Sequence, residues 1–422
     1  MLPDDLVEYN WIGDVERLER YEPGGYHPVM VGDLLHDRYR IVDKLGFGGY
    51  STIWLAHDHQ RKQYVAVKVG VSSPSLPRRE ANILRELSVL LSTPQASHHM
   101  PAILDEFDIQ GPNGTHTCYT VTPAQGNLKE ACFSRLFPIR VARALAAKLA
   151  VTVALVHSQG FVHGDIHLRN VLIRLSSKFD ELSIDQLKEK FGEPEAIPIS
   201  RVDGKPLPSN IPTQAVVPLY LGKKAQDFTL TDARGLLLSD FGEAFSPSKE
   251  QRLGKSCNTP VAVRAPEAFF EPDTRLSYPS DIWSLGTAIW EILGMKFIFS
   301  ESETVDEVVA QQIDVLSFGN FPASWRQHWE QPRTDNMNMQ QGIPRRPTGD
   351  REAWPPLDEA FEEFVQKYRR KQEARGVFGE EETQDILDLM RGMLKFGPKE
   401  RLTIDEVLNS KWMKKWALPE LK

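Results

Sequence analysis

The chain has 422 residues, 41% of them hydrophobic and 26% charged, which excludes a single small module and a globally disordered protein. Acidic residues outnumber basic ones by 58 to 50, and the net charge of −8 argues against non-specific binding to nucleic acid and favours a basic partner. The three cysteines lie too far apart for a disulfide framework or a CxxC metal site, and no apolar stretch is long enough to span a bilayer, so we expect a soluble intracellular protein without a membrane partner.

The first part of the chain predicts an arm followed by a small β-rich unit. Residues 1–38 mix acidic residues, Pro and Gly with isolated aromatics, which indicates an extended N-terminal extension. From Tyr39, short β-like runs alternate with Gly or polar turns, as in an antiparallel meander. The segment REANILRELSVLL then spaces its apolar residues three and four apart, which predicts one amphipathic helix. We therefore expect a β-rich lobe with one helix over 39–122.

The rest of the chain is mainly helical in pattern. Five segments with helical periodicity follow Gly126, so we expect a large helical lobe over 123–416 and a C-terminal tail over 417–422. A polar, Pro-rich stretch interrupts this lobe at about 176–235, and its length predicts a structureless insertion. The expected fold class is α+β, with an antiparallel β-rich unit preceding a helical one.

Two features of the β-rich unit suit phosphate binding. The segment LGFGGYSTIW places Gly46, Gly48 and Gly49 between two β-like runs, where glycine lets the backbone approach phosphates, although a plain hairpin turn explains the same residues. The strand VAVK ends in Lys68, whose ammonium group could lie against phosphates. Glu80 at the start of the helix is its expected ion-pair partner.

Two polar sites in the helical part suit proton transfer and metal binding. In FVHGDIHLRNVLI, Asp165 can accept a hydroxyl proton and the amide oxygen of Asn170 can bind Mg²⁺. Asp240 follows an apolar strand in LLLSDFGEA, where it could reach the same ion. His163 and His167 have a spacing seen in zinc sites, but no further ligand lies nearby in the sequence.

These motifs occur in a fixed order with RAPE and DIWSLG, and together they resemble a eukaryotic protein kinase from about Tyr39 to Trp416. The arm sequence GGYHPVMVGDLLHDRYRIVDKLGFGGYSTIWLAHD is similar to that of the serine/arginine-rich (SR) protein kinases, which also carry an insertion before DFG. The resemblance implies a bilobal fold with ATP and Mg²⁺ as cofactors, catalytic roles for Asp165, Lys68 and Glu80, metal binding by Asn170 and Asp240, and a buried Glu267–Arg401 pair. The ATP site would consist of Leu45, Gly46, Gly48, Gly49, Ile53, Ala66, Lys68, Thr122 and Ala124.

The catalytic loop departs from the kinase pattern H-R-D-x-K at two positions. Gly164 replaces the arginine that would read an activation-segment phosphate, so we expect competence without phosphorylation. His167 replaces the lysine that neutralises the transferring phosphoryl group. Arg169 stands one residue before Asn170, as in many tyrosine-kinase loops, and is the expected substitute for that charge.

The resemblance implies phosphorylation of Ser/Thr in proteins, most of all Arg/Ser-rich splicing-type substrates, by a monomer acting in cytoplasm and nucleus. The acidic runs ESETVDE, LDEAFEEF and FGEEETQD could dock a basic substrate, although solvated helix faces are the favoured explanation for them. Two alternatives stay open. The first is a pseudokinase or binding scaffold whose catalysis is weakened by His167. The second is a small-molecule phosphotransferase, because the string HGDIHLRN also resembles the catalytic loop of those enzymes.

Overall fold

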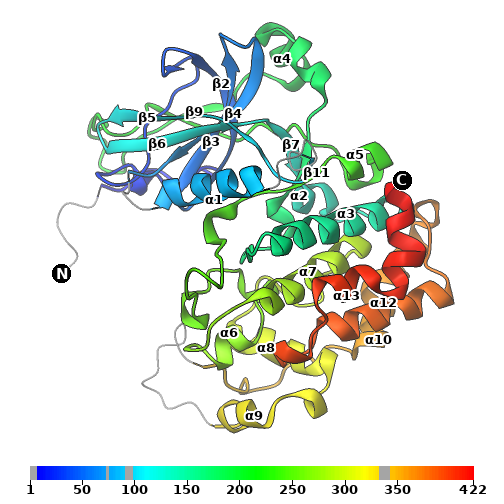
Figure 1. Ribbon diagram of the computed structural model, residues 1–422. Coiled ribbons are helices and arrows are strands. Elements are labelled where there is room, and N and C mark those ends of the chain that lie inside the picture. The colour runs from blue at the N-terminus through cyan, green and yellow to red at the C-terminus, as the bar shows by residue number, and fades with distance from the viewer. Residues whose placement is uncertain (1–6, 73–75, 91–97, 332–342) are drawn as a thin grey trace. The chain divides into compact units, whose positions relative to one another are not determined.

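The computed structural model describes residues 7–72, 76–90, 98–331 and 343–422. The chain divides into two compact units. The first consists of Met1–Ser97, Pro101–Gly126 and Arg174–Gly222, and the second of His98–Met100, Asn127–Ile173 and Lys223–Lys422. The first unit carries an antiparallel sheet and the second is mainly helical, which confirms the predicted α+β class (Figure 1).

The first unit is built on a six-stranded antiparallel sheet of order β1-β2-β3-β4-β6-β5. Side chains alternate between its two faces, as strand geometry requires. Val65, Val67 and Val69 of β4 pack with Trp54 in one buried cluster, which leaves Ala66 and Lys68 on the opposite face. The elements are β1 (Leu34–Leu35), β2 (Tyr39–Gly48), β3 (Ser51–Asp58), β4 (Gln63–Gly70), helix α1 (Leu76–Leu90), β5 (Ile103–Gly111) and β6 (Gly114–Val121).

The insertion is not structureless, and most of it belongs to the first unit rather than to the helical lobe in which it was expected. It contains α4 (Ile184–Phe191), followed by the antiparallel pair β9 (Ala196–Pro198) and β10 (Gln214–Val216). Its apolar side chains explain the difference, because they are buried in the clusters of the first unit: Phe179 and Leu187 pack with Val42 and Tyr64, while Val216 joins the cluster around Trp54.

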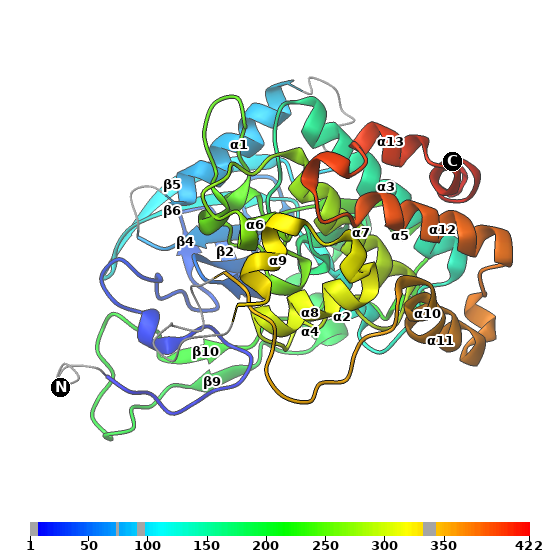
Figure 2. The same cartoon turned by 90° about the horizontal axis from the view of Figure 1, so that it is seen from below.

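The N-terminal arm packs on this insertion. Leu18, Tyr21 and Tyr26 of the arm form one buried cluster with Ile199, Ile211 and Ala215 of the insertion and Val71 after β4. Tyr9 forms an antiparallel bridge to Arg201, and Figure 2 shows the arm running beside β9 and β10. Two segments about 190 positions apart therefore fold as one layer of the first unit.

The second unit is organised around α3 (Ile139–Ser158) and α7 (Tyr278–Leu293), which pack on one another and are buried along most of their lengths. A short antiparallel pair, β8 (Val171–Arg174) with β11 (Leu236–Leu238), carries the loops that concern catalysis. None of the described helices is long and apolar enough to cross a membrane. The remaining elements are β7 (Ala124–Asn127), α2 (Leu128–Cys132), α5 (Leu230–Arg234), α6 (Glu267–Phe270), α8 (Val305–Leu316), α9 (Ala323–Trp329), α10 (Leu357–Phe361), α11 (Lys367–Lys371), α12 (Glu380–Met393) and α13 (Ile404–Asn409).

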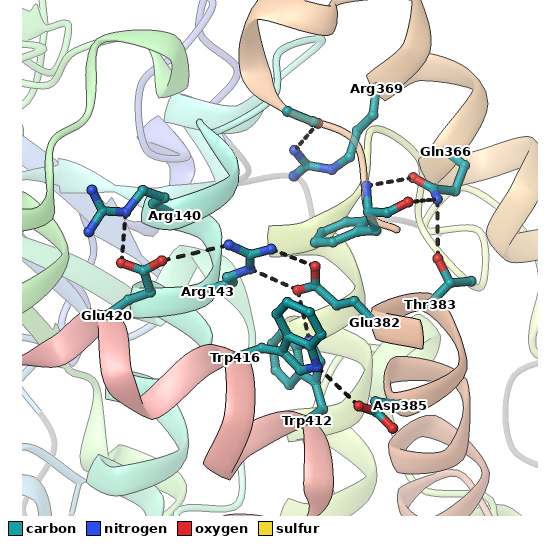
Figure 3. A network of polar contacts seen from close by, with 12 residues as sticks. Arg140, Arg143, Gln366, Arg369, Glu382, Thr383, Asp385, Trp412, Trp416 and Glu420 are labelled. Carbon is teal, nitrogen blue, oxygen red and sulfur yellow. Dashed lines mark hydrogen bonds and ion pairs between the residues drawn. The ribbon is translucent and has the colours of Figure 1, made fainter. Parts of the chain in front are cut away.

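The C-terminal residues 417–422 pack on the helical unit. Ala417 is fully buried, and Glu420 accepts a hydrogen bond from Arg140 of α3 at 2.9 Å. Figure 3 shows that α12 contacts both α3 and the C-terminal part of the chain. Glu382 of α12 pairs with Arg143 of α3 at 2.5 Å, and Asp385 of α12 accepts a hydrogen bond from the Trp416 indole at 3.0 Å. These carboxylates lie in the acidic run FGEEETQD, so part of that run has a structural role.

Candidate active site

The glycine-rich segment forms the hairpin between β2 and β3. The strand register pairs Gly46 with Ile53 and Gly48 with Ser51, so Gly49 and Tyr50 form a two-residue turn. None of the three glycines has a positive φ angle, and a Cβ atom built on Gly46 or Gly48 would meet no atom within 4 Å. Neither turn geometry nor packing among the described residues therefore explains these two glycines, whereas room for a ligand against the backbone does.

Lys68 and Glu80 form the predicted ion pair, with Nζ 2.6 Å from Oε2. The side chains are 18% and 8% exposed, so the carboxylate holds the ammonium group in a largely buried place. Lys68 lies opposite Ile53 on β3 and Tyr119 on β6. The structure thus confirms Glu80 as the partner of Lys68 and aligns the glycine hairpin, Ile53 and Lys68 across one sheet.

The other residues expected to contact adenine lie near the end of this row. Ala66 is on the same face of β4 as Lys68 and pairs with Val121, the last residue of β6. Thr122 follows β6 and is exposed, and Ala124 begins β7. Leu45 on β2 is partly buried against Val42 and its neighbours. Their contact with ATP stays a prediction.

Asp165 is held by two residues of its own loop. The Asn170 side-chain amide donates to the backbone oxygen of Asp165 at 2.9 Å and to Oδ2 at 3.0 Å, and His167 Nε2 lies 3.3 Å from the same Oδ2. The other carboxylate oxygen, Oδ1, is buried and has no hydrogen-bond partner within the described part of the chain. A buried acceptor without a partner is costly unless a ligand satisfies it, so Oδ1 suits a substrate hydroxyl.

Asp281 of α7 holds the backbone of the catalytic loop. Its carboxylate accepts from the amides of His163 at 2.7 Å and Gly164 at 2.9 Å, and it contacts His157 Nε2 at 2.9 Å. Burial alone would raise the pKa of Asp281, but the contact with His157 and the Gly164 amide outweigh burial and hold the pKa below its usual range. The carboxylate therefore stays ionised and fixes the loop.

His163 is structural rather than a zinc ligand. The amide of Asp165 donates to Nδ1 at 3.2 Å, which leaves Nε2 to donate to the Ser239 carbonyl at 3.1 Å. Its ring packs edge-on against the buried Phe241, with ring centroids 4.7 Å apart. Within the described residues, no group of three or more His, Cys, Asp or Glu side chains is arranged to hold a metal ion.

Asn170 and Asp240 lie at the same end of the β8–β11 pair, because Val171 is opposite Leu238. Ser239 donates to the Asn170 carbonyl from both its amide, at 2.8 Å, and its hydroxyl, at 2.9 Å. Since the Asn170 side-chain NH₂ binds Asp165, its Oδ1 is the atom left for a cation. Asp240 has φ 61° and an exposed side chain. An amide oxygen and a carboxylate suit a divalent ion that is completed by phosphates.

The activation segment, residues 240–267, packs directly on Gly164. This residue has φ +77°, and a Cβ atom there would lie 2.9 Å from the Glu243 carbonyl oxygen, so an arginine could not stand at this position without a shift. Glu243 pairs with Arg252 at 2.6 Å and accepts from Asn258 at 2.9 Å. The Glu243 carboxylate thus holds the segment. Competence without phosphorylation stays a prediction.

The two departures in the catalytic loop differ in placement. His167 contacts the Asp165 carboxylate, whereas Arg169 is exposed and makes no hydrogen bond or ion pair with the described residues. No carboxylate in the described part of the chain pairs with Arg169. Its substitution for the missing lysine stays a prediction.

The comparisons with known proteins agree with this arrangement. The family described as "Protein kinase domain" matches residues 39–184 and 224–413, and the gap falls within the insertion. A serine/threonine protein kinase of Aspergillus fumigatus is 24% identical over 416 residues, covering 94% of this chain and 90% of that protein. Protein kinase dsk1 of Schizosaccharomyces pombe is 25% identical over 488 residues, covering 96% and 86%. SRSF protein kinase 3 of Homo sapiens is 29% identical over 160 residues, covering 36% of this chain and 28% of that protein.

The chain therefore belongs to the protein kinase family. It is an ATP-dependent protein serine/threonine kinase similar to the SR protein kinases, as the motifs predicted. A kinase domain of this family works with ATP and a divalent metal ion.

Sequence reasoning missed two groups of contacts around the site. Arg20 and Tyr26 of the arm bind the tip of the glycine hairpin, and Arg252 binds Glu243 in the activation segment. The aromatic residues of the arm were a usable signal, since isolated tyrosines indicate packing on a folded body. Nothing in the local pattern around Arg252 indicates its partner.

Proposed function

We propose that the chain phosphorylates serine and threonine in Arg/Ser-rich proteins, with Asp165 as the residue that receives the substrate hydroxyl. The observation that carries the catalytic part is the state of the Asp165 carboxylate: Oδ2 is held by Asn170 and His167, and Oδ1 is buried without a partner among the described residues. A hydroxyl that donates to Oδ1 would be oriented for in-line attack and could pass on its proton.

The remaining roles follow from chemistry and placement. Lys68, fixed by Glu80, binds the ATP phosphates, and the backbone amides of the glycine hairpin cover them. Asn170 Oδ1 and the Asp240 carboxylate hold Mg²⁺, the divalent ion that we propose for this site. When bound, Mg²⁺ neutralises the charge of the phosphate oxygens. Arg169 supplies a further positive charge that the loop otherwise lacks.

The preference for Arg/Ser-rich substrates is supported by the relatives, one of which is named SRSF protein kinase 3. The net charge of −8 favours a basic substrate. The acidic runs that were expected to dock a basic substrate contribute less to substrate binding than the sequence suggests, because some of their carboxylates are paired within the chain. Glu307 pairs with Arg351 at 3.2 Å and Glu382 with Arg143 at 2.5 Å. We propose, on the same grounds of similarity, action in cytoplasm and nucleus and a role in regulating mRNA splicing.

Transfer of radiolabel from [γ-³²P]ATP tests the substrate class. The wild-type chain is given an Arg-Ser repeat protein, a lysine-rich basic protein or small aminated alcohols, and Asp165→Asn is the control for each. We expect label on the Arg-Ser protein at a rate at least tenfold above the lysine-rich protein. Label on the alcohols alone would indicate a small-molecule phosphotransferase, and no label above the control in any arm would indicate a pseudokinase.

A further inference from the structure

The N-terminal arm binds the tip of the glycine hairpin at two successive carbonyl groups. The Tyr26 hydroxyl donates to the Gly48 carbonyl oxygen at 2.8 Å, and the Arg20 guanidinium donates to the Gly49 carbonyl oxygen. The next carbonyl, that of Tyr50, accepts from the Val71 amide at 2.9 Å. The three carbonyl groups of the tip, those of Gly48, Gly49 and Tyr50, therefore all accept hydrogen bonds from residues of the first unit. The donors to Gly48 and Gly49 belong to the arm.

These bonds also determine where the amide hydrogens of the tip point. A trans peptide group is planar, and its N–H and C=O bonds point in opposite directions. Because the carbonyls of Gly48 and Gly49 point to the arm, the N–H groups of Gly49 and Tyr50 point away from it. Backbone N–H groups in such a loop are the donors that bind phosphate oxygens.

The arm is itself anchored to the strand that enters the hairpin. Glu16 binds both the Lys44 ammonium of β2 and the Tyr21 hydroxyl, and the Lys44 and Glu16 side chains are 0% and 2% exposed. Removing one partner of such a buried pair would leave an uncompensated charge, so the anchor is not readily released.

The arm is also fixed by hydrogen bonds from the insertion and from the turn between β5 and β6. Asn210 donates to the Tyr21 carbonyl at 2.6 Å, and Asn113 donates to the carbonyls of Tyr26 at 2.7 Å and Asn210 at 2.9 Å. Tyr26 is 3% exposed, and Arg20 lies with its guanidinium carbon 5.0 Å from the centre of the Tyr26 ring. The donors that reach the hairpin are therefore fixed in place before any ligand binds.

We propose that Arg20 and Tyr26 are positioning residues for the phosphates of ATP: they hold the hairpin carbonyls so that the amides of Gly49 and Tyr50 face the nucleotide. The inference rests on the proposed role of the hairpin in covering the phosphates. It gives the arm and the insertion a function in the kinase reaction, since both are needed to fix these two side chains.

Isothermal titration of the full chain with Mg·ATP and with adenosine tests this inference, because adenosine lacks the phosphates. The variants are Arg20→Ala, Arg20→Lys and Tyr26→Phe. Arg17→Ala is the matched control, since Arg17 is an exposed arginine of the same arm without a side-chain hydrogen bond to the described residues. We expect Arg20→Ala to weaken Mg·ATP binding about tenfold and Tyr26→Phe about threefold, with Arg20→Lys intermediate, while adenosine binding changes less than about twofold.

The control should bind both ligands as the wild type does. Unchanged Mg·ATP affinity in Arg20→Ala and Tyr26→Phe would overturn the inference, and so would an equal loss for adenosine, which indicates a general structural role. If Arg20→Ala does not fold, Arg20→Lys and Tyr26→Phe decide by the same criterion. A wild type that binds adenosine as tightly as Mg·ATP would overturn the proposed role of the hairpin, and this inference with it.

Discussion

Glu267 and Arg401 form a buried, bidentate ion pair in the second unit, with Nη1 2.8 Å from Oε1 and Nη2 2.5 Å from Oε2. Every guanidinium nitrogen is used, since Arg401 also donates to the carbonyls of Pro279, Phe396 and Lys395. Arg401→Met would leave the Glu267 carboxylate buried and unpaired, which we expect to lower the free energy of unfolding by about 3–5 kcal/mol. Urea denaturation measures this change. Lys367→Ala, which breaks an exposed pair with Glu363, is the control and should leave the free energy of unfolding nearly unchanged; a loss equal to that of Arg401→Met would contradict the interpretation.

The Lys68–Glu80 pair leads to a prediction about turnover. Lys68→Met removes the charge that binds the phosphates, so we expect phosphoryl transfer to fall by at least about 10³-fold. The fold should be retained, because Lys68 is on the face of β4 opposite the buried valines. Steady-state kinetics and circular dichroism measure the two properties, with the exposed Lys62→Met as control. Retained activity in Lys68→Met would refute the assignment.

Arg169 is exposed and without a partner among the described residues, so no neighbouring carboxylate described in the structure neutralises its charge. If it supplies the missing charge, it acts mainly in the transition state, and Arg169→Ala should lower the single-turnover rate by about 10²-fold with little change in ATP affinity. His167→Lys should then be nearly neutral. Equal rates in wild type and Arg169→Ala, both above background, would exclude this role. A gain in rate only in His167→Lys would indicate a pseudokinase weakened by His167.

His27 of the arm, which is partly buried, and the buried His116 of β6 should make stability depend on pH. The rings of His27 and His116 lie 4.9 Å apart, and burial together with the neighbouring imidazole lowers the pKa of His27 to about 4, while burial lowers that of His116. The unfolded chain takes up protons below about pH 6.5, whereas the folded one does not. The stabilisation from His27 is therefore complete above that pH and falls as the pH is lowered towards 4, with a limiting slope of about 1.4 kcal/mol per pH unit, and His116 contributes in the same direction.

Urea denaturation between pH 7 and 5 measures this slope, and the His27→Gln variant should show a shallower one, because it cannot bind the proton. An unchanged slope in His27→Gln would contradict the prediction.

The catalytic residues could be predicted from the sequence because each stands at a motif with its own local signal. Lys68 follows three apolar residues within a strand, Asp240 follows a strand, and Asn170 lies five residues after Asp165, so short-range spacing was sufficient to place these residues. The Glu267–Arg401 contact was also predicted, but through the family resemblance rather than from spacing.

The insertion could not be predicted in the same way. Its buried residues, such as Ile199 and Ile211, are separated by polar and proline-rich sequence and show no helical or strand periodicity. Their partners are Tyr21 and Tyr26, nearly 190 positions earlier, and such long-range packing leaves no local pattern. The arm contacts to Gly48 and Gly49 were missed for the same reason.

The most direct test of the kinase account is single-turnover transfer of the γ-phosphoryl group to an Arg-Ser repeat protein, followed by phosphoamino-acid analysis, in wild type and Asp165→Asn. We expect phosphoserine in the wild type and a rate at least about 10³-fold lower in the variant, with ATP affinity unchanged, because only the orientation of the hydroxyl is lost. Equal rates in the two proteins, or a product other than phosphoserine and phosphothreonine, would contradict the account.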